Sequence, residues 1–261
     1  MWDQLTQTLG LLVQGTDLSL FAYGGLCAAA LTGSFVSASI GLGGGVLTIA
    51  VMALVLPPSV LLPIHGMVQA SSNGFRALLL RPHIRFQVFV PFAVGTSLGV
   101  WAGGSLAISL EVWLLQLILA LFVLYTTWIP GFRSNRTGHW KFFGCGTGTG
   151  FATMFIGGSG TLVAPFVNAA FDKRQEVVAT HATLMTFQHT LKIIFFGLTG
   201  FSGAAYIPLL VGLLVSGVIG TWIGRRLLNT LNEALFRNII RWVLTALAAR
   251  MVYSAISGMS I

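Results

Sequence analysis

Two stretches of the sequence carry side chains that can bind an anion or exchange a proton. Offsets of 0, 4, 7 and 11 residues place four side chains on one face of a helix in each stretch. The first face holds His65, Gln69, Ser72 and Arg76, and the second holds His181, Met185, Gln188 and Lys192. Imidazole titrates near neutral pH, and guanidinium and ammonium groups donate hydrogen bonds to anions. Each helix is therefore predicted to present a polar stripe to a small anion.

A glycine cluster precedes each polar stripe. The clusters are Gly41-Leu42-Gly43-Gly44-Gly45 and Gly157-Gly158-Ser159-Gly160. Consecutive glycines do not sustain a helix, so each cluster is predicted to be a turn between two helical legs. The legs expected to begin at Val46 and Thr161 would aim free N–H groups and about half a positive charge at an anion. The hydroxyls of Ser159 and Thr161 add donors to this predicted cradle for a compact oxyanion.

These turns and stripes together form the predicted substrate-binding site. Its residues are Gly43, Gly44, Gly45, Val46, His65, Gln69, Ser72, Arg76, Gly157, Gly158, Ser159, Gly160, Thr161, His181, Gln188 and Lys192. No metal site, cofactor or catalytic residue is predicted, and Cys27 and Cys145 lack metal-ligand spacing.

Each feature has a simpler interpretation. Glycines also let membrane helices pack closely, which is how single glycines such as Gly95 and Gly212 are interpreted. Arg76 lies near the end of its stretch, where its side chain would reach the loop region by snorkelling. An intramembrane histidine such as the unmatched His189 often does no more than bond a neighbouring carbonyl.

The composition requires that these elements lie in a membrane. Of the 261 residues, 55% are hydrophobic and 8% are charged, which is too little polar surface for a soluble domain. At about 20 residues per crossing, the chain accommodates six to eight crossings. The composition excludes a soluble catalytic domain. The net charge of +8 lies in loops between apolar runs, so it does not indicate nucleic-acid binding.

The apolar stretches predict an all-α integral membrane protein. They are 18–56, 62–80, 86–107 and 112–130 in a first repeat over 1–131, and 142–171, 177–198, 204–224 and 236–256 in a second repeat over 132–261. The stretches 18–56 and 142–171 contain the glycine clusters and are predicted to be hairpins with both ends on one side.

The hairpin interpretation follows from the distribution of basic residues. It places the following eleven on one, cytoplasmic, side: Arg81, Arg85, Arg133, Arg136, Lys141, Lys173, Arg174, Arg225, Arg226, Arg237 and Arg241. The other side, with both termini, holds Asp3, Asp17 and Glu111. Arg250, inside the last stretch, is left unplaced.

The two halves of the chain match each other. A shift of 115 residues superposes Gly43, Gly45 and Leu47 on Gly158, Gly160 and Leu162, and a shift of 116 superposes the polar stripes. Each half is a hairpin followed by three crossings, and three is odd, so the halves are predicted to be inverted-topology repeats forming one transport domain. In transporters with inverted repeats and broken helices, the substrate binds near the midplane.

The glycine turns, the run Leu162-Val163-Ala164-Pro165 and the inverted spacing resemble the TauE/SafE family of sulfite and organosulfonate exporters over nearly the whole chain. The resemblance implies a bacterial inner-membrane transporter of sulfite, sulfoacetate, thiosulfate or similar anions, coupled to protons or the membrane potential. In one departure, the first half has Ile49-Ala50 where the second half has Pro165. The sequence leaves open which anion is carried, in which direction, and whether two copies form a homodimer.

Three alternatives remain at this point. A passive anion channel can use the same glycine turns and cations. An intramembrane serine protease resembling rhomboids would use Ser159 as nucleophile with His181 or His189 as base. A transporter of another anion, a carboxylate or phosphonate, fits the same pattern.

Overall fold

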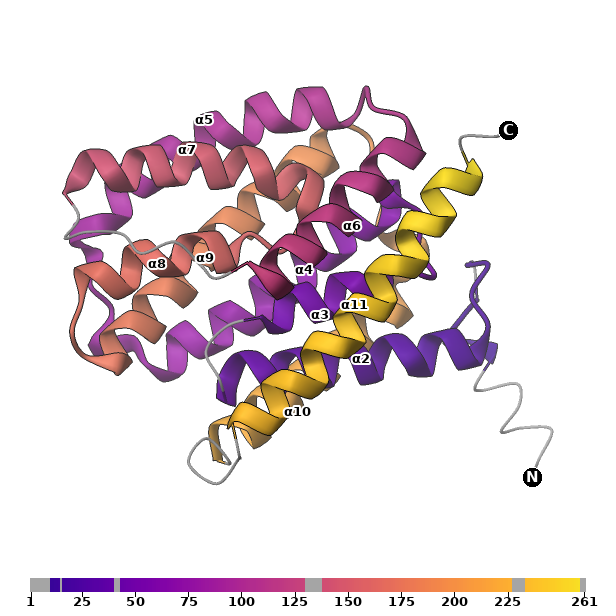
Figure 1. Cartoon of the computed structure of the whole chain (residues 1–261), viewed down its shortest axis with the longest axis horizontal. Helices are drawn as coiled ribbons and strands as arrows, with labels where there is room; N and C mark the ends of the chain where they lie inside the picture. Colours follow the sequence, from indigo (N-terminus) through magenta and orange to yellow (C-terminus); the bar gives the residue numbers. More distant parts are fainter. Residues whose placement is uncertain (1–9, 15, 40–42, 130–137, 227–232, 259–261) are drawn as a thin grey trace.

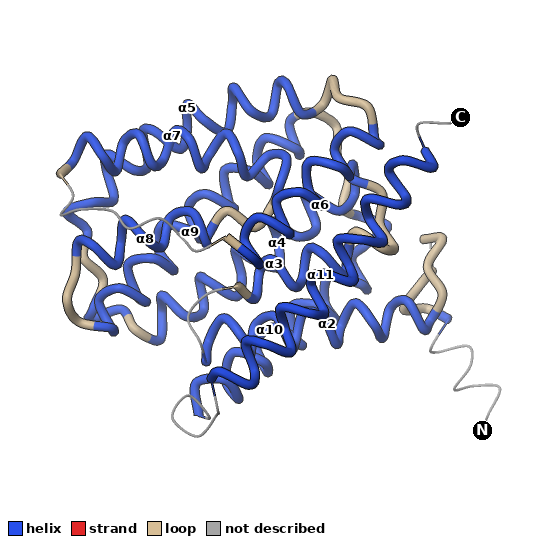
Figure 2. Tube along the Cα trace, in the orientation of Figure 1, coloured by secondary structure: helices blue, strands red, loops and turns tan. Residues whose placement is uncertain are grey.

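The computed structural model describes residues 10–14, 16–39, 43–129, 138–226 and 233–258, and no strand occurs within these ranges. Figure 1 shows the helices side by side, joined by the short loops and turns of Figure 2. The helices are α2 (Leu20–Ser39), α3 (Gly44–Met52), α4 (Pro58–Leu79), α5 (Phe89–Ala107), α6 (Val112–Trp128), α7 (His139–Ile156), α8 (Gly160–Ala170), α9 (Arg174–Leu198), α10 (Ile207–Arg226) and α11 (Glu233–Gly258), with 3-10 turns η1 (Arg81–His83), η2 (Phe86–Val88) and η3 (Ala204–Tyr206).

The two helices that carry the polar stripes form a central antiparallel pair. A methyl group on Gly66 of α4 would lie 3.6 Å from Lys192 Cδ of α9, and one on Gly74 would lie 3.5 Å from Thr186 Cγ2. Residue numbers thus rise along α4 as they fall along α9. The stripes are buried between the other helices, which explains why these two long helices carry polar residues at membrane depth.

Glycine turns interrupt the chain between α2 and α3 and between α7 and α8. Gly43 has φ 92° and Gly157 has φ 64°, conformations that other residues rarely adopt. Gly41 and Leu42 lie outside the described residues. The second legs begin at Gly44 and Gly160, not at the expected Val46 and Thr161. The reason is that each turn needs a positive φ at only one glycine, so Gly44, Gly45 and Gly160 already belong to the helices that follow, while Gly158 lies in the second turn itself.

The second legs are too short to cross a bilayer. α3 has 9 residues and α8 has 11, which at 1.5 Å per residue span about 14 and 17 Å of a core about 30 Å thick. In Figure 1 the outer ends of α2 and α3 lie at the right of the molecule, whereas those of α7 and α8 lie at the left.

The helices that precede the two glycine turns, α2 and α7, are called the outer legs. Each packs closely on a helix of the other half. Methyl groups on Gly95 and Gly99 of α5 would each lie 2.1 Å from a carbonyl oxygen of α7. On α10, methyl groups on Gly212 and Gly220 would lie 2.1 Å from Tyr23 Oη and Leu31 O of α2. These close approaches confirm the interpretation of Gly95 and Gly212 as packing residues. We call the two contacts, α5 with α7 and α10 with α2, the glycine seams.

The helix pairings are the same when the halves are exchanged. α5 packs on α7 as α10 packs on α2, while α4 pairs with α9 and α6 pairs with α11. The boundary between the halves, predicted between residues 131 and 132, falls in a segment that is not described.

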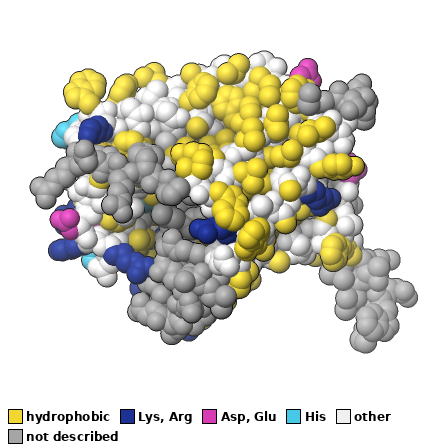
Figure 3. Space-filling view, viewed as in Figure 1, with side chains coloured by type: hydrophobic (Ala, Val, Ile, Leu, Met, Phe, Trp, Pro, Cys, Tyr) yellow, Lys and Arg dark blue, Asp and Glu magenta, His cyan; other side chains and the backbone are white. Residues whose placement is uncertain are grey.

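The outer surface is apolar, as a membrane protein requires. Within the part of the chain that the structure describes, four helical segments are long and apolar enough to cross a membrane: Leu20–Ser39, Phe86–Ala107, Ala204–Arg226 and Asn238–Gly258. Large hydrophobic side chains on them are exposed, among them Phe21 and Val90. Figure 3 shows these yellow side chains over much of one face, with most of the visible Lys and Arg side chains toward the left end.

We call the end of the molecule that carries Arg85 and Lys173 the basic end. There, an ion-pair cluster joins the loop after α4 to α9. Arg85 donates to the carboxylate of Glu176, and Lys173 Nζ lies 4.0 Å from the same oxygen. The backbone N–H of Arg85 also donates to Thr180 Oγ1 at 3.0 Å. The hydrogen bond from Arg85 lowers the pKa of Glu176, and the bonded carboxylate raises the pKa of Arg85.

Candidate functional site

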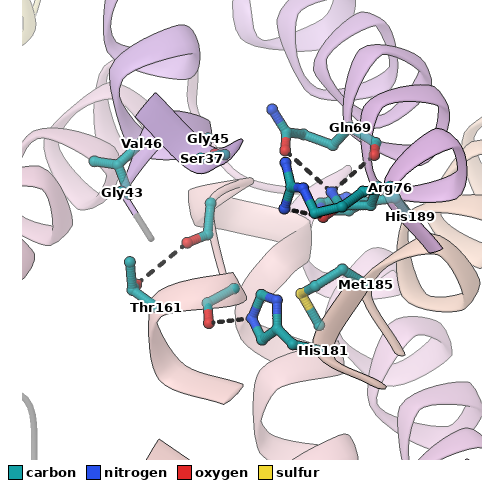
Figure 4. A pocket seen from close by; sticks show the side chains of 13 residues that line it. Ser37, Gly43, Gly45, Val46, Gln69, Arg76, Thr161, His181, Met185 and His189 are labelled. Atoms are coloured by element: carbon teal, nitrogen blue, oxygen red, sulfur yellow. Dashed lines mark hydrogen bonds between the residues drawn. The ribbon is translucent and has the colours of Figure 1, made fainter. Parts of the chain in front are cut away.

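A cavity lies where the two glycine turns meet the stripes of α4 and α9. Its empty volume is about 380 Å³, counted to its open mouth. It is lined by Ser37, Gly43, Gly45, Val46, Gln69, Asn73, Arg76, Gly158, Gly160, Thr161, His181, Met185 and His189. In Figure 4 the two turns approach from one side, and the side chains of α4 and α9 approach from the other.

The two glycine turns meet at this cavity. A methyl group on Gly158 would lie 3.1 Å from Val46 Cγ2 and 3.5 Å from Val46 N. The first backbone bonds of the second legs run from Leu47 N to Gly43 O and from Leu162 N to Ser159 O. The amides that precede them therefore have no acceptor inside their own helix. Two helix N-termini, each with about half a positive charge, converge on one place.

Each turn is held by the histidine of the stripe in its own half. His65 Nε2 lies 3.0 Å from Gly45 O, and His181 Nε2 lies 2.9 Å from Gly160 O. A carbonyl oxygen only accepts, so Nε2 carries the hydrogen in both rings and Nδ1 is left free to take a proton. The two histidines, which the sequence comparison of the halves predicts to be equivalent, thus make the same kind of bond to the turns.

Arg76 supplies a buried cation to the cavity wall. Its side chain is buried, and its Nη1 donates to Asn73 Oδ1 at 3.4 Å. Asn73 in turn donates to the carbonyl oxygen of Gln69 at 2.8 Å. No carboxylate lies within ion-pair distance of Arg76 among the described residues. The side chain therefore lines the cavity and does not snorkel into the loop.

Nine predicted site residues line this cavity and the other seven do not. The nine are Gly43, Gly45, Val46, Gln69, Arg76, Gly158, Gly160, Thr161 and His181. The seven outside the lining are Gly44, His65, Ser72, Gly157, Ser159, Gln188 and Lys192.

Three of these seven have structural roles, two in helix contacts and one in the second turn. A methyl group on Gly44 would lie 1.7 Å from Gly33 O, so Gly44 packs against α2. Ser72 Oγ lies 3.2 Å from Ser34 Oγ and 3.3 Å from Thr221 Oγ1, and so links α4 to α2 and α10. Gly157 provides the positive φ of the second turn.

Ser159 and Gln188 form a buried pair beside the second turn. Gln188 Nε2 donates to Ser159 Oγ at 2.6 Å and to Thr149 O at 3.0 Å. This network joins α7, the second turn and α9. The recorded partner of the Ser159 hydroxyl is an amide, whereas a serine nucleophile requires a base within hydrogen-bond reach.

Four cavity residues were missed or not assigned to the site from the sequence. Asn73 and His189 each lie eight residues after the histidine of their stripe, and that equal offset was an available signal. Met185 was recognised on the second stripe only as the counterpart of Gln69. Ser37 belongs to α2, and no spacing in the sequence connects it to the turns.

The family comparison agrees with this architecture. A family model described as sulfite exporter TauE/SafE matches residues 26–251, which is nearly the whole chain. The chain belongs to the TauE/SafE family. Searches of curated proteins and of solved structures found no match. Membership supports a multi-pass membrane anion transporter, and in this TauE/SafE protein both glycine turns and both stripes fall inside the matched region.

Proposed function

We propose that this protein is a secondary transporter that moves small sulfur-containing anions across the bacterial inner membrane by alternating access. The observation that carries the proposal is the cavity in which two helix N-termini and Arg76 converge without a carboxylate in its lining. Such a site attracts an anion and repels a cation, because its helix N-termini and its arginine present positive charge to the ligand.

The size and chemistry of the site favour a compact oxyanion. Amides before Leu47 and Leu162 approach from two sides, and Arg76 and Thr161 approach from α4 and α8. Hydrogen bonds to a charged partner contribute about 1.5–3 kcal/mol each. This energy offsets the cost of holding an unpaired arginine at membrane depth, roughly 2.5–3.5 kcal/mol on insertion scales. Sulfite and thiosulfate both present several acceptor oxygens within this small volume.

Inverted repeats supply the means of alternation in this proposal. It is supported by the opposite directions in which the two hairpins open and by helix pairings that are unchanged when the halves are exchanged. The basic end is proposed to face the cytoplasm, following the bias of lysine and arginine in short loops. Export then follows from the imposed gradient of anion, proton or potential.

A ligand screen of the purified protein tests the proposal. Sulfite, thiosulfate or sulfoacetate should raise the melting temperature more than phosphate, and Arg76→Met should weaken binding about tenfold or more. Arg81→Met, which removes an exposed arginine in the next loop, is the matched control and should bind normally. Absence of anion binding in the intact protein would refute the proposed site.

Transport measurements separate the transporter from the channel. In proteoliposomes clamped at zero membrane potential, a transporter coupled to protons accumulates labelled anion against its gradient when a proton gradient is imposed, whereas a channel only equilibrates it. Accumulation abolished by Arg76→Met supports alternating access at this cavity. Rapid equilibration without accumulation would favour the passive channel.

The histidines are proposed to link transport to pH. His65→Ala or His181→Ala should flatten the pH dependence of transport, because the described membrane-spanning stripes contain no acidic side chain. Initial rates across a pH series in proteoliposomes measure this. Unchanged profiles in both variants would remove the histidines from proton coupling.

A further inference from the structure

Buried nitrogens without a hydrogen-bond partner cluster on the central helix pair. Among the described residues, five buried side-chain polar atoms have no partner, and four of them are His65 Nδ1, Arg76 Nε, His189 Nδ1 and Lys192 Nζ. Buried polar groups are normally bonded, so each exception needs an explanation. The cavity explains Arg76 and His189, which line it. It does not explain Lys192, which is 0% exposed and outside the lining.

The antiparallel geometry places Arg76 and Lys192 at different depths. Lys192 lies opposite Gly66, ten residues before Arg76 on α4, which corresponds to about 15 Å along the helix axis. Arg76 and His181 lie toward the ends of α4 and α9 that meet at the Arg85–Glu176 pair. Lys192 and His65 lie toward the opposite end. The two cations therefore bracket the glycine turns.

The cavity lining is almost symmetric between the halves. Five repeat-equivalent pairs line it from both sides: Gly43 with Gly158, Gly45 with Gly160, Val46 with Thr161, Gln69 with Met185, and Asn73 with His189. Three positions break the symmetry: Arg76 and His181 line the cavity while their equivalents Lys192 and His65 do not, and Ser37 of α2 has no counterpart in the lining. Arg76 and His181 lie toward the basic end, whereas Lys192 and His65 lie toward the opposite end.

We propose that Lys192 and His65 form a second anion subsite, equivalent to Arg76 and His181, which the anion reaches when access switches away from the basic end. This inference rests on the proposed transport function and deepens it. The present structure has the Arg76 side of the cavity formed and the Lys192 side closed. In the alternate state the same five shared pairs line the cavity, but Lys192 replaces Arg76 at its wall.

The chemistry of the second subsite suits an oxyanion. The ammonium of Lys192 has three donors and no recorded acceptor. The rings of His65 and His189 have centroids 5.9 Å apart, and a methyl group on Gly66, the residue after His65, would lie 3.6 Å from Lys192 Cδ and 3.8 Å from His189 O. His65 Nε2 is held by Gly45 O, and a methyl group on Gly157 would lie 3.2 Å from His65 Nδ1. The free Nδ1 therefore faces the second turn, where it accepts a hydrogen bond from a protonated anion.

Sided cysteine labelling tests the second subsite directly. Cys27 and Cys145 are first replaced by alanine, and Lys192→Cys or Arg76→Cys is then introduced into vesicles of known orientation. A membrane-impermeant thiol reagent should label Arg76→Cys from the basic end and Lys192→Cys from the opposite face. Labelling of Lys192→Cys from the same face as Arg76→Cys, or from neither face, would overturn the proposal.

A functional arm uses Lys192→Met, with the exposed Lys141→Met as matched control. We expect Lys192→Met to bind sulfite from the basic end within about twofold of the wild type, but to transport it about tenfold more slowly or worse. Wild-type transport by Lys192→Met would overturn the second subsite. If Lys192→Met does not fold, the labelling result decides. Failure of the proposed function differs, since the wild type itself would then neither bind nor transport the anion.

Discussion

Replacing Gly157 by alanine probes the geometry on which the second turn depends. Gly157 has φ 64° and ψ −45°, a conformation that costs other residues about 1–2 kcal/mol or more. The added methyl group would lie 2.0 Å from Ile49 Cδ1, and overpacking of a core costs about 1–3 kcal/mol. The two effects act together, so Gly157→Ala should lower the free energy of unfolding by about 2–5 kcal/mol.

A second substitution separates the backbone strain from the clash. Ile49→Val removes the Cδ1 atom and alone costs about 0.5–1.5 kcal/mol. In the Gly157→Ala background it should relieve the clash, so the double variant should be more stable than the sum of the singles by about 1–3 kcal/mol. The strain from the positive φ should remain.

Thermal unfolding of the purified protein in detergent measures these differences. The control is Gly197→Ala, because its methyl group would meet nothing within 4 Å and its helical position favours alanine by about 0.5–1 kcal/mol. If Gly157→Ala is as stable as the wild type, or if Ile49→Val gives no relief, the contact between the second turn and α3 is not as described.

Three further outcomes follow from the described contacts. Gly99→Ala should destabilise the protein because its methyl group would lie 2.1 Å from Thr147 O, whereas Gly148→Ala, with open space, should not; melting temperatures decide. Glu176 has a lowered pKa through Arg85, so their ion pair stabilises the fold above the ordinary pKa of about 4.5 and is lost as the pH falls through the lowered value. Arg85→Gln should therefore lower the melting temperature near neutral pH and have less effect in acid; an equal loss at both would contradict this. Ser159→Ala should change the anion Kd by less than about threefold, since Ser159 lies outside the cavity lining. A proteolytic activity that Ser159→Ala abolished would favour the protease instead.

The sequence predicted the elements better than it predicted the site. Glycine clusters identified both interrupted segments, because a turn at Gly43 or Gly157 depends on local backbone freedom. Which stripe residues line the cavity depends on how far α4 and α9 are shifted along each other. A single sequence does not reveal the relative alignment of two helices. Lys192 and Arg76 therefore looked equivalent in the repeat. In the structure Arg76 lines the cavity, whereas Lys192 is fully buried outside its lining.

Some of the missed site residues have a signal in the sequence and others have none. Asn73 and His189 occupy matching repeat positions, and adding offset 8 to the offsets 0, 4, 7 and 11 of the stripe would have included both. Ser37 comes from α2, and only the packing of Gly44 against that helix brings it near the turn. A contact of this kind arises from tertiary structure and has no sequence period.

The glycine seams have a consequence for biosynthesis. Each seam joins an outer leg of one half to a helix of the other, and the bond from Tyr23 Oη to Pro208 O spans 185 residues. At about 5–20 residues per second, α2 waits roughly 10–40 s for the ribosome to make its partner α10. During that interval lipid or the insertion machinery must shield its exposed polar groups. We therefore expect the amino-terminal half expressed alone to be degraded, and to be rescued when the missing half is supplied as a separate polypeptide.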